Sequence, residues 1–161
     1  MSKIIIGVTG PGLGASKTDT EVAFQIGKLI AQEGWVLLTG GRNQGVMDAA
    51  SKGAKGVGGL TVGILPTADR KTFSRHVDIE IITEMKSARN NINVLSSQVV
   101  VVCGMGAGTA SEAAMAIKAN KSVVLINQDE TSRQFFQNIG GKQVTFVDTP
   151  EEVIEEVKRL L

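Results

Sequence analysis

The sequence is poor in the residues that build metal centres and disulfides. It contains one histidine, His76, and one cysteine, Cys103. One cysteine cannot form a disulfide within the chain, and together these two residues leave no cluster with zinc-ligand spacing. A Ser-His-acid site would depend on His76, yet no G-x-S-x-G elbow occurs anywhere. We therefore expect no structural metal, a small buried core residue at Cys103 and a solvated loop residue at His76.

The sequence also lacks a surplus of either charge and any long apolar run. Lysine and arginine number 17 against 16 acidic residues, and no basic stretch is interleaved with aromatic residues, so binding to nucleic acid is not expected. No apolar run approaches the roughly 20 residues of a membrane helix, and the amino terminus has no signal-peptide pattern. These absences favour a cytoplasmic protein that does not span a membrane and that binds a small molecule.

The order of apolar segments predicts one α/β domain over residues 1–161. Short β-branched runs alternate with amphipathic stretches, which is typical of repeated βα units and a mainly parallel sheet. Seven strands are expected, at 3–9, 35–40, 60–65, 77–82, 98–104, 122–127 and 143–147. Six helices are expected, at 19–34, 44–56, 85–97, 108–121, 132–139 and 149–161. The run Val99–Val102 has no polar alternation, so we place its strand at the centre of the sheet with helices on both faces.

Three strand ends run directly into glycine-rich segments. The first carries Gly10 and Gly12, the second Gly40 and Gly41, and the third the segment 104–108. In open parallel sheets ligands bind outside the carboxyl ends of the strands, where loops and helix amino termini converge. The glycines therefore predict a ligand site at this edge, with close approach of the backbone to the ligand.

The third segment is the best candidate for a phosphate site. Gly104, Met105, Gly106, Ala107 and Gly108 precede Thr109 at the expected start of a helix, where free N–H groups and the helix dipole favour an anion. A tight strand-to-helix turn is the alternative, but a turn alone would need only one or two glycines.

The second segment adds polar groups to the same edge. Arg42 and Asn43 supply a guanidinium and an amide, which suit contacts to a phosphate or a heterocycle. A plain turn with an exposed arginine is the alternative interpretation. The charged stretch 66–76 follows the third strand and is expected to be a surface loop, and whether it closes over a ligand is left open.

The first segment resembles two nucleotide motifs and completes neither. Gly10, Gly12 and Ala15 fit the spacing G-x-G-x-x-G/A, but the second strand ends without the acidic residue that would hold a ribose, so no NAD is expected. Residues 16–18 read Ser-Lys-Thr, and a P-loop would have glycine before the lysine, so an NTPase is not expected either.

Arg89 and Glu112 are the pair that could carry out covalent chemistry. They flank the third glycine segment, the first before its strand and the second one helical turn after it. Beside a phosphate cradle they could orient a ribose 5'-phosphate and stabilise the cation formed when a glycosidic bond breaks. A buried salt bridge between two helices explains the same pair.

The segment CGMGAGTASE resembles the G-G-x-G-T-x-x-E signature of the Lonely Guy and lysine-decarboxylase-like superfamily. The likeness extends from residue 40 through the A-R-N of residues 88–90 to the glycine segment, and within the superfamily the chain is most similar to the molybdenum cofactor carriers. The resemblance implies a Rossmann-like three-layer fold and a homo-oligomer, dimeric or tetrameric. It also implies a phosphorylated pterin whose phosphate lies on 106–109 and whose remainder is held by Arg42, Asn43, Arg89 and Asn90.

The resemblance leaves three functions open. Arg89 and Glu112 match the positions that support cleavage of nucleoside 5'-monophosphates to free base and ribose 5-phosphate in the Lonely Guy enzymes. The P-G-G opening of the enzymes is replaced by Cys103, Gly104 and Met105, and their basic pair by Arg89 and Asn90. We therefore favour a carrier that protects molybdenum cofactor and delivers it to molybdoenzymes or insertion proteins, over a phosphoribohydrolase or a sensor for another nucleotide.

Overall fold

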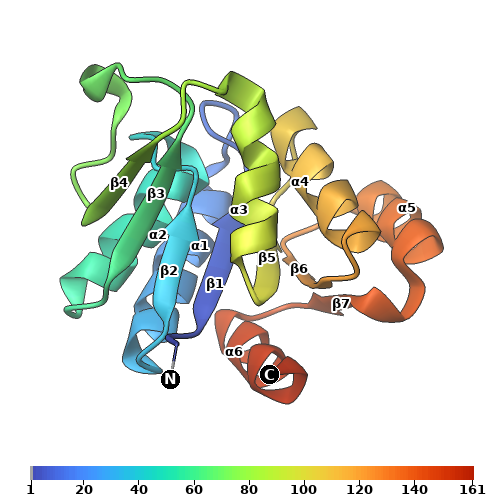
Figure 1. The fold of residues 1–161 in the computed structure, drawn as a ribbon. Coiled ribbons are helices and arrows are strands. Elements are labelled where there is room, and N and C mark those ends of the chain that lie inside the picture. Colours follow the sequence, from blue (N-terminus) through green and yellow to red (C-terminus); the bar gives the residue numbers. More distant parts are fainter. Residues whose placement is uncertain (1) are drawn as a thin grey trace.

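The computed structural model describes residues 2–161 as one parallel sheet with helices on both faces (Figure 1). Its strands are β1 Ile5–Thr9, β2 Val36–Thr39, β3 Thr61–Leu65, β4 Ile79–Ile82, β5 Val99–Cys103, β6 Ser122–Ile126 and β7 Val144–Val147. Its α-helices are α1 Lys17–Gln32, α2 Gly45–Gly56, α3 Asn90–Ser96, α4 Ala107–Lys118, α5 Glu130–Gly140 and α6 Pro150–Leu160. Short 3-10 turns lie at Arg70–Thr72, Lys86–Arg89 and Gly141–Gln143. The expected Rossmann-like α/β class is confirmed.

The strand order is β4-β3-β2-β1-β5-β6-β7, and every neighbouring pair is parallel. The chain builds outward from β1 to β4 and then crosses back to place β5 on the other side of β1. This reversal opens a crevice at the carboxyl ends of β1 and β5, which is where open α/β sheets bind ligands. The middle position belongs to β1, so the prediction that the 99–103 strand is central is wrong by one place.

The core has two halves, one on each face of the sheet. Strand β5 sends Val99, Val101 and Cys103 into the half covered by α1, α2 and α6, and Val100 and Val102 into the half covered by α3, α4 and α5. Successive side chains of a strand point to opposite faces, so a strand covered on both faces must be apolar throughout. This burial explains why the sequence of β5 shows no polar alternation.

The boundaries of two helices illustrate how local chemistry decides them. Helix α6 begins as expected, because Thr149 and Glu152 form a capping box around Pro150 in the first turn. The helix expected at 85–97 instead opens with the 3-10 turn Lys86–Arg89 and becomes α-helical only from Asn90. Lys86 has a φ of 50°, a left-handed backbone conformation that a regular α-helix does not include. In residues 2–161, no helix is both long and apolar enough to cross a membrane.

Candidate anion-binding cavity

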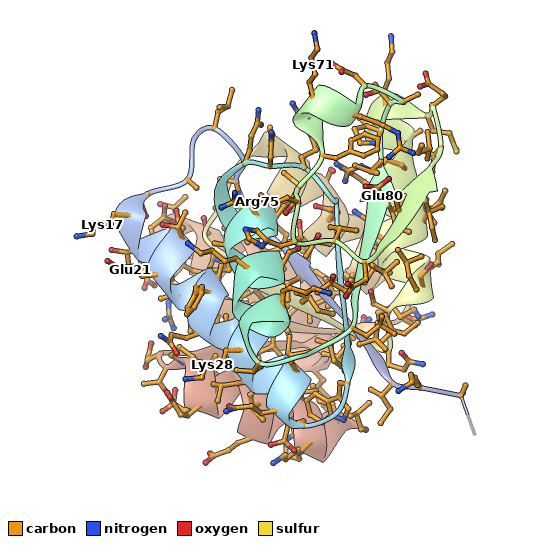
Figure 2. The ribbon with its side chains drawn as sticks, turned by 90° about the vertical axis from the view of Figure 1, so that its left-hand side faces the viewer. Lys17, Glu21, Lys28, Lys71, Arg75 and Glu80 are labelled. Atoms are coloured by element: carbon orange, nitrogen blue, oxygen red, sulfur yellow. The ribbon has the colours of Figure 1, made fainter. Side chains whose placement is uncertain are left out.

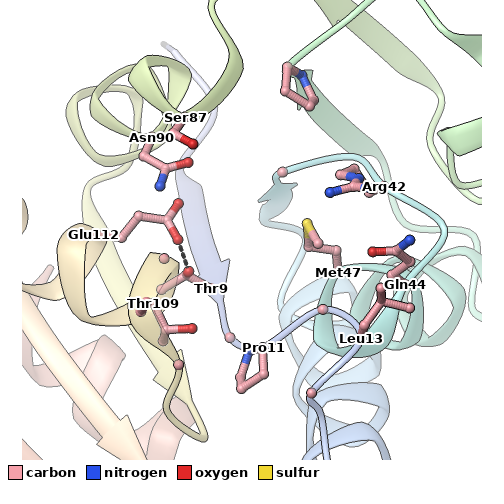
Figure 3. Close-up of a pocket in the computed structure, with 18 of the residues that line it drawn as sticks. Thr9, Pro11, Leu13, Arg42, Gln44, Met47, Ser87, Asn90, Thr109 and Glu112 are labelled. Atoms are coloured by element: carbon pink, nitrogen blue, oxygen red, sulfur yellow. Dashed lines mark hydrogen bonds between the residues drawn. The ribbon is translucent and has the colours of Figure 1, made fainter.

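A cavity of about 790 Å³ opens at the carboxyl ends of β1, β2 and β5. Figure 3 shows two walls that face each other across it. Arg42, Gln44 and Met47 form one wall, and Thr109 and Glu112 belong to the other. The remaining boundary comes from the loop after β1 and from the segment that joins β3 to α3.

The cavity brings together twelve of the fifteen residues that the sequence nominates for ligand binding. They are Gly10, Gly12, Gly40, Arg42, Arg89, Asn90, Met105, Gly106, Ala107, Gly108, Thr109 and Glu112. The other three, Gly41, Asn43 and Gly104, do not line it. All three glycine segments contribute to the lining, although the second and third also carry residues with a different task.

The three residues that do not line the cavity make contacts within the protein instead. Gly104 has a φ of 72°, and a Cβ there would overlap the carboxylate of Asp19. Gly41 has a φ of 73° and packs against Leu65 of β3. The amide of Asn43 is turned away from the cavity and donates to the Lys71 carbonyl at 2.9 Å.

Helix α4 presents an uncapped amino terminus to the cavity. Its N-cap is Gly106, which has no side chain to occupy the free N–H groups of the first turn. A Cβ on Gly108 would meet no heavy atom within 4 Å, so the space in front of this turn is open. Free N–H groups and the positive end of the helix dipole together favour an anion here.

Helix α1 is closed to anions in the same region. The Ser16 hydroxyl accepts from the backbone N–H of Asp19 at 3.0 Å, and the Asp19 carboxylate accepts from the N–H of Ser16 at 2.8 Å. Figure 2 shows Lys17 on the outer surface. The segment that resembles a P-loop is therefore a capping box, and its own carboxylate holds the place of an anion.

Glu112 is buried at the base of the α4 wall. One of its oxygens accepts from the hydroxyl of Thr9 and the other from the amide of Asn93, the latter at 2.8 Å. Burial raises the pKa of the Glu112 carboxyl, while these two hydrogen bonds and the charge of Arg89 oppose the rise. A carboxyl group in such a position can hold its proton to a higher pH than an exposed one.

Arg89 is 7% exposed and reaches across to the end of β2. A Cβ on Gly40 would lie 2.6 Å from Nη1 and 2.7 Å from Nη2 of Arg89, so the guanidinium occupies the space that a side chain at residue 40 would need. Nη1 donates to Oδ1 of Asn90 at 2.9 Å. Among the ion pairs of residues 2–161, none joins Arg89 to Glu112 within 4.0 Å, so the salt-bridge interpretation of this pair is not what the geometry shows.

Several lining residues were not foreseen from the sequence. They include Thr9, Pro11, Leu13, Gln44, Met47, Pro66, Thr67, Thr72, Lys86 and Ser87. A signal existed for Thr9, since it is the last residue of an apolar strand and precedes a glycine segment. The others depend on how loops, a 3-10 turn and the start of α2 are placed over the sheet edge, and no local sequence pattern predicts this placement.

Cys103 is fully buried as expected, with its thiol donating to the Asp19 carbonyl at 3.4 Å. Burial, with a smaller contribution from Asp19, raises the pKa of the thiol to about 12. A thiol with so high a pKa is a packing residue and a poor nucleophile at neutral pH. Over residues 2–161, no three His, Cys, Asp or Glu side chains come close enough to hold a metal ion.

The model of the SLOG cluster4 family matches residues 3–154. The chain belongs to this family. An uncharacterized protein from Archaeoglobus fulgidus is 41% identical to this chain over 88% of this chain and 89% of its own length. A cytokinin riboside 5'-monophosphate phosphoribohydrolase from Mycobacterium tuberculosis is 33% identical over 57% of this chain and 50% of its own.

Two solved structures are similar to this chain over nearly its whole length. The molybdenum cofactor binding protein of Rippkaea orientalis superposes with a TM-score of 0.97 at 54% identity, over 99% of this chain and 98% of that one. The molybdenum cofactor carrier protein of Chlamydomonas reinhardtii gives 0.95 at 46% identity, over the same shares of the two chains. The resemblance to the molybdenum cofactor carriers is thereby confirmed.

Proposed function

We propose that this protein binds molybdenum cofactor in the cavity at the carboxyl ends of β1 and β5. The observation that carries the proposal is the uncapped amino terminus of α4, which opens into a cavity large enough for a small-molecule ligand. The structural relatives at 46–54% identity, which bind or carry molybdenum cofactor, support it independently.

The residues of the cavity fit a phosphorylated pterin. The first-turn N–H groups at 107–109 would hold the phosphate. Gln44, Ser87 and Asn90 offer amide and hydroxyl groups for a heterocycle, and Met47 an apolar contact. The lining includes three cations, Arg42, Lys86 and Arg89, against the single carboxylate of Glu112, so its charge favours an anionic ligand.

Protection and transfer of the cofactor form the second part of the proposal. A carrier needs to exclude solvent from its cargo and to release it unchanged to a recipient such as a cofactor-free molybdoenzyme. The α4 wall supports binding without chemistry, because both oxygens of Glu112 already accept hydrogen bonds from Thr9 and Asn93. A carboxylate engaged in this way positions the wall and has little freedom to act on a ligand.

Cleavage of a nucleoside 5'-monophosphate is the second candidate function. Arg89 and Glu112 line the same cavity, and the raised pKa of Glu112 is suited to a general acid. The likeness to the mycobacterial phosphoribohydrolases supports this candidate, although the chain spans about half the length of those relatives.

One experiment separates the two candidates. The purified protein is incubated with molybdenum cofactor, isolated by gel filtration and mixed with a cofactor-free molybdoenzyme, while a parallel sample is assayed for release of free base from nucleoside monophosphates. Co-eluting cofactor that restores the molybdoenzyme, without base release, is the expected result. Base release that disappears in Glu112→Gln would replace the carrier function with hydrolysis, and neither result would leave a nucleotide sensor.

A further inference from the structure

The cavity contains two arginines that each have a buried nitrogen without a hydrogen-bond partner in the protein. Nε of Arg42 and Nε of Arg89 are both buried without a hydrogen-bond partner. Buried polar atoms in proteins are almost always paired, and an unpaired one costs free energy. A single ligand group that accepts hydrogen bonds would account for both unpaired nitrogens, because both arginines line the same cavity.

Arg42 and Arg89 both line the cavity, and neither forms an ion pair with a carboxylate of residues 2–161. Burial lowers the pKa of Arg89, the charge of Glu112 opposes this, and the charge of Arg42 adds a smaller lowering. Glu112 is the carboxylate whose charge acts on Arg89, and its two oxygens already accept hydrogen bonds from Thr9 and Asn93.

The backbone holds this arrangement in place. Arg42 forms an isolated antiparallel bridge with Phe73, and the flanking hydrogen bonds run from Asn43 N–H to the Thr72 carbonyl and from Ser74 N–H to the Gly41 carbonyl, both at 2.9 Å. Arg89 rests on the bare backbone of Gly40. An anion between or beside two such positive charges would relieve their mutual repulsion.

We infer that Arg42 and Arg89 form a second anion subsite, on the wall opposite the amino terminus of α4. Figure 3 shows Arg42 across the cavity from Thr109 and Glu112. The cavity then takes a ligand with an anionic group at each end, a phosphate at α4 and a second, planar or tetrahedral oxoanion-like group at the arginine pair. Arginine forks suit such groups because they donate two parallel hydrogen bonds.

This inference rests on the proposed function, since it concerns the same cavity, and it sharpens the choice between ligands. The base of a nucleoside monophosphate is neutral and would leave the arginine pair unmatched. The metal-bearing end of molybdenum cofactor carries anionic oxygen and sulfur ligands and would match it. The subsite thus explains why a cavity built around one phosphate cradle also contains the cations Arg42 and Arg89.

Tungstate provides a direct test that does not require molybdenum cofactor, because it is a tetrahedral dianion whose heavy atom is located by anomalous scattering. Crystals of the wild type soaked in tungstate should show one ion at residues 107–109 and a second at the arginine pair. In Arg42→Gln the second ion should disappear and the first remain, and in Arg75→Gln, which removes an exposed arginine outside the cavity, both should remain.

Solution binding gives the second measurement. Calorimetric titration with tungstate should show two sites in the wild type and one in Arg42→Gln, with the affinity of the lost site reduced at least about 10-fold. Tungstate found only at α4, or bound equally by Arg42→Gln, would overturn the second subsite and leave the proposed function standing. Tungstate at both sites in a protein that does not bind molybdenum cofactor would overturn the proposed function and leave the subsite standing.

Discussion

Asn93 of α3 donates a hydrogen bond of 2.8 Å to Glu112 of α4, beneath the base of the cavity. Thr9 of β1 donates to the other oxygen of the same carboxyl group. Glu112 therefore fastens a strand and two helices at the point where the α4 wall begins. The side-chain oxygen of Asn93 has no partner of its own, so this amide is held mainly by its contact with Glu112.

Removing the Asn93 amide should destabilise the protein. Asn93→Ala leaves a buried carboxylate oxygen without a donor, which should lower the free energy of unfolding by about 1–3 kcal/mol. Urea denaturation followed by circular dichroism measures the change. Asn91→Ala is the matched control, because Asn91 lies on the same helix with an exposed side chain and should change stability by less than about 0.5 kcal/mol. Equal effects of the two substitutions would show that the buried contact contributes nothing.

The raised pKa of Glu112 predicts a pH dependence of stability. Above the ordinary value of 4.5 the unfolded carboxyl group loses its proton, while the folded one keeps it to a higher pH. The folded state then binds more protons than the unfolded state, so this group makes stability fall as pH rises through that interval. The penalty for burying the charged carboxylate is fully present above the raised pKa.

Glu112→Gln isolates this contribution. Glutamine cannot ionise, and its amide can donate to the free oxygen of a reoriented Asn93 or to the hydroxyl of Thr9. The stability of the wild type relative to the variant should therefore decline as the pH rises above 4.5, which urea midpoints measured at several pH values will show. Asp78 and Glu156 have lowered pKa values and affect the pH dependence in the opposite direction, but they do so equally in both proteins. Their contributions therefore cancel when the stability of the variant is subtracted from that of the wild type. Parallel profiles for the two proteins would contradict the raised pKa.

Much of the fold was predictable from patterns that act locally. The uninterrupted valines of β5 indicated burial on both faces, and Thr149 with Glu152 indicated the start of α6. The edge strand β4 was harder, since all four of its residues are exposed and only its β-branched composition identifies it. Local patterns do not determine strand order, which explains why β5 was placed at the centre in place of β1.

The site was less predictable because similar residue types serve different purposes there. Gly104 and Gly108 belong to one glycine segment, but the first makes room for Asp19 and the second lines the cavity. Asn43 follows Arg42 directly, yet its amide binds the backbone of the 66–76 segment. Which of two adjacent polar residues faces a ligand depends on the path of a loop that packs against it from elsewhere in the chain.

The different task of Gly104 leads to a prediction about stability. Gly104→Ala combines a left-handed backbone, with a φ of 72°, and an overlap with the Asp19 carboxylate. Gly34→Ala is the matched control, because Gly34 has a φ of 75° and a Cβ there would meet nothing within 4 Å. Gly34→Ala should lower the free energy of unfolding by about 1–2 kcal/mol from backbone strain alone, and Gly104→Ala should lower it clearly more. Thermal unfolding of both variants measures the difference. Equal decreases in stability would show that the Asp19 side chain moves aside without a loss of stability.

Gly108→Leu should abolish ligand binding without harming the fold. A Cβ at residue 108 would meet no heavy atom within 4 Å, and a helical Cβ is tilted toward the amino terminus, so leucine would project over the free N–H groups that we assign to the phosphate. Leucine also has a better helix propensity than glycine by nearly 1 kcal/mol, so stability should be retained or slightly raised. Gly56→Leu, at the far end of α2 where a Cβ is equally free, should keep full binding. Co-elution of molybdenum cofactor with each variant measures this, and undiminished binding by a folded Gly108→Leu protein would place the phosphate elsewhere in the cavity.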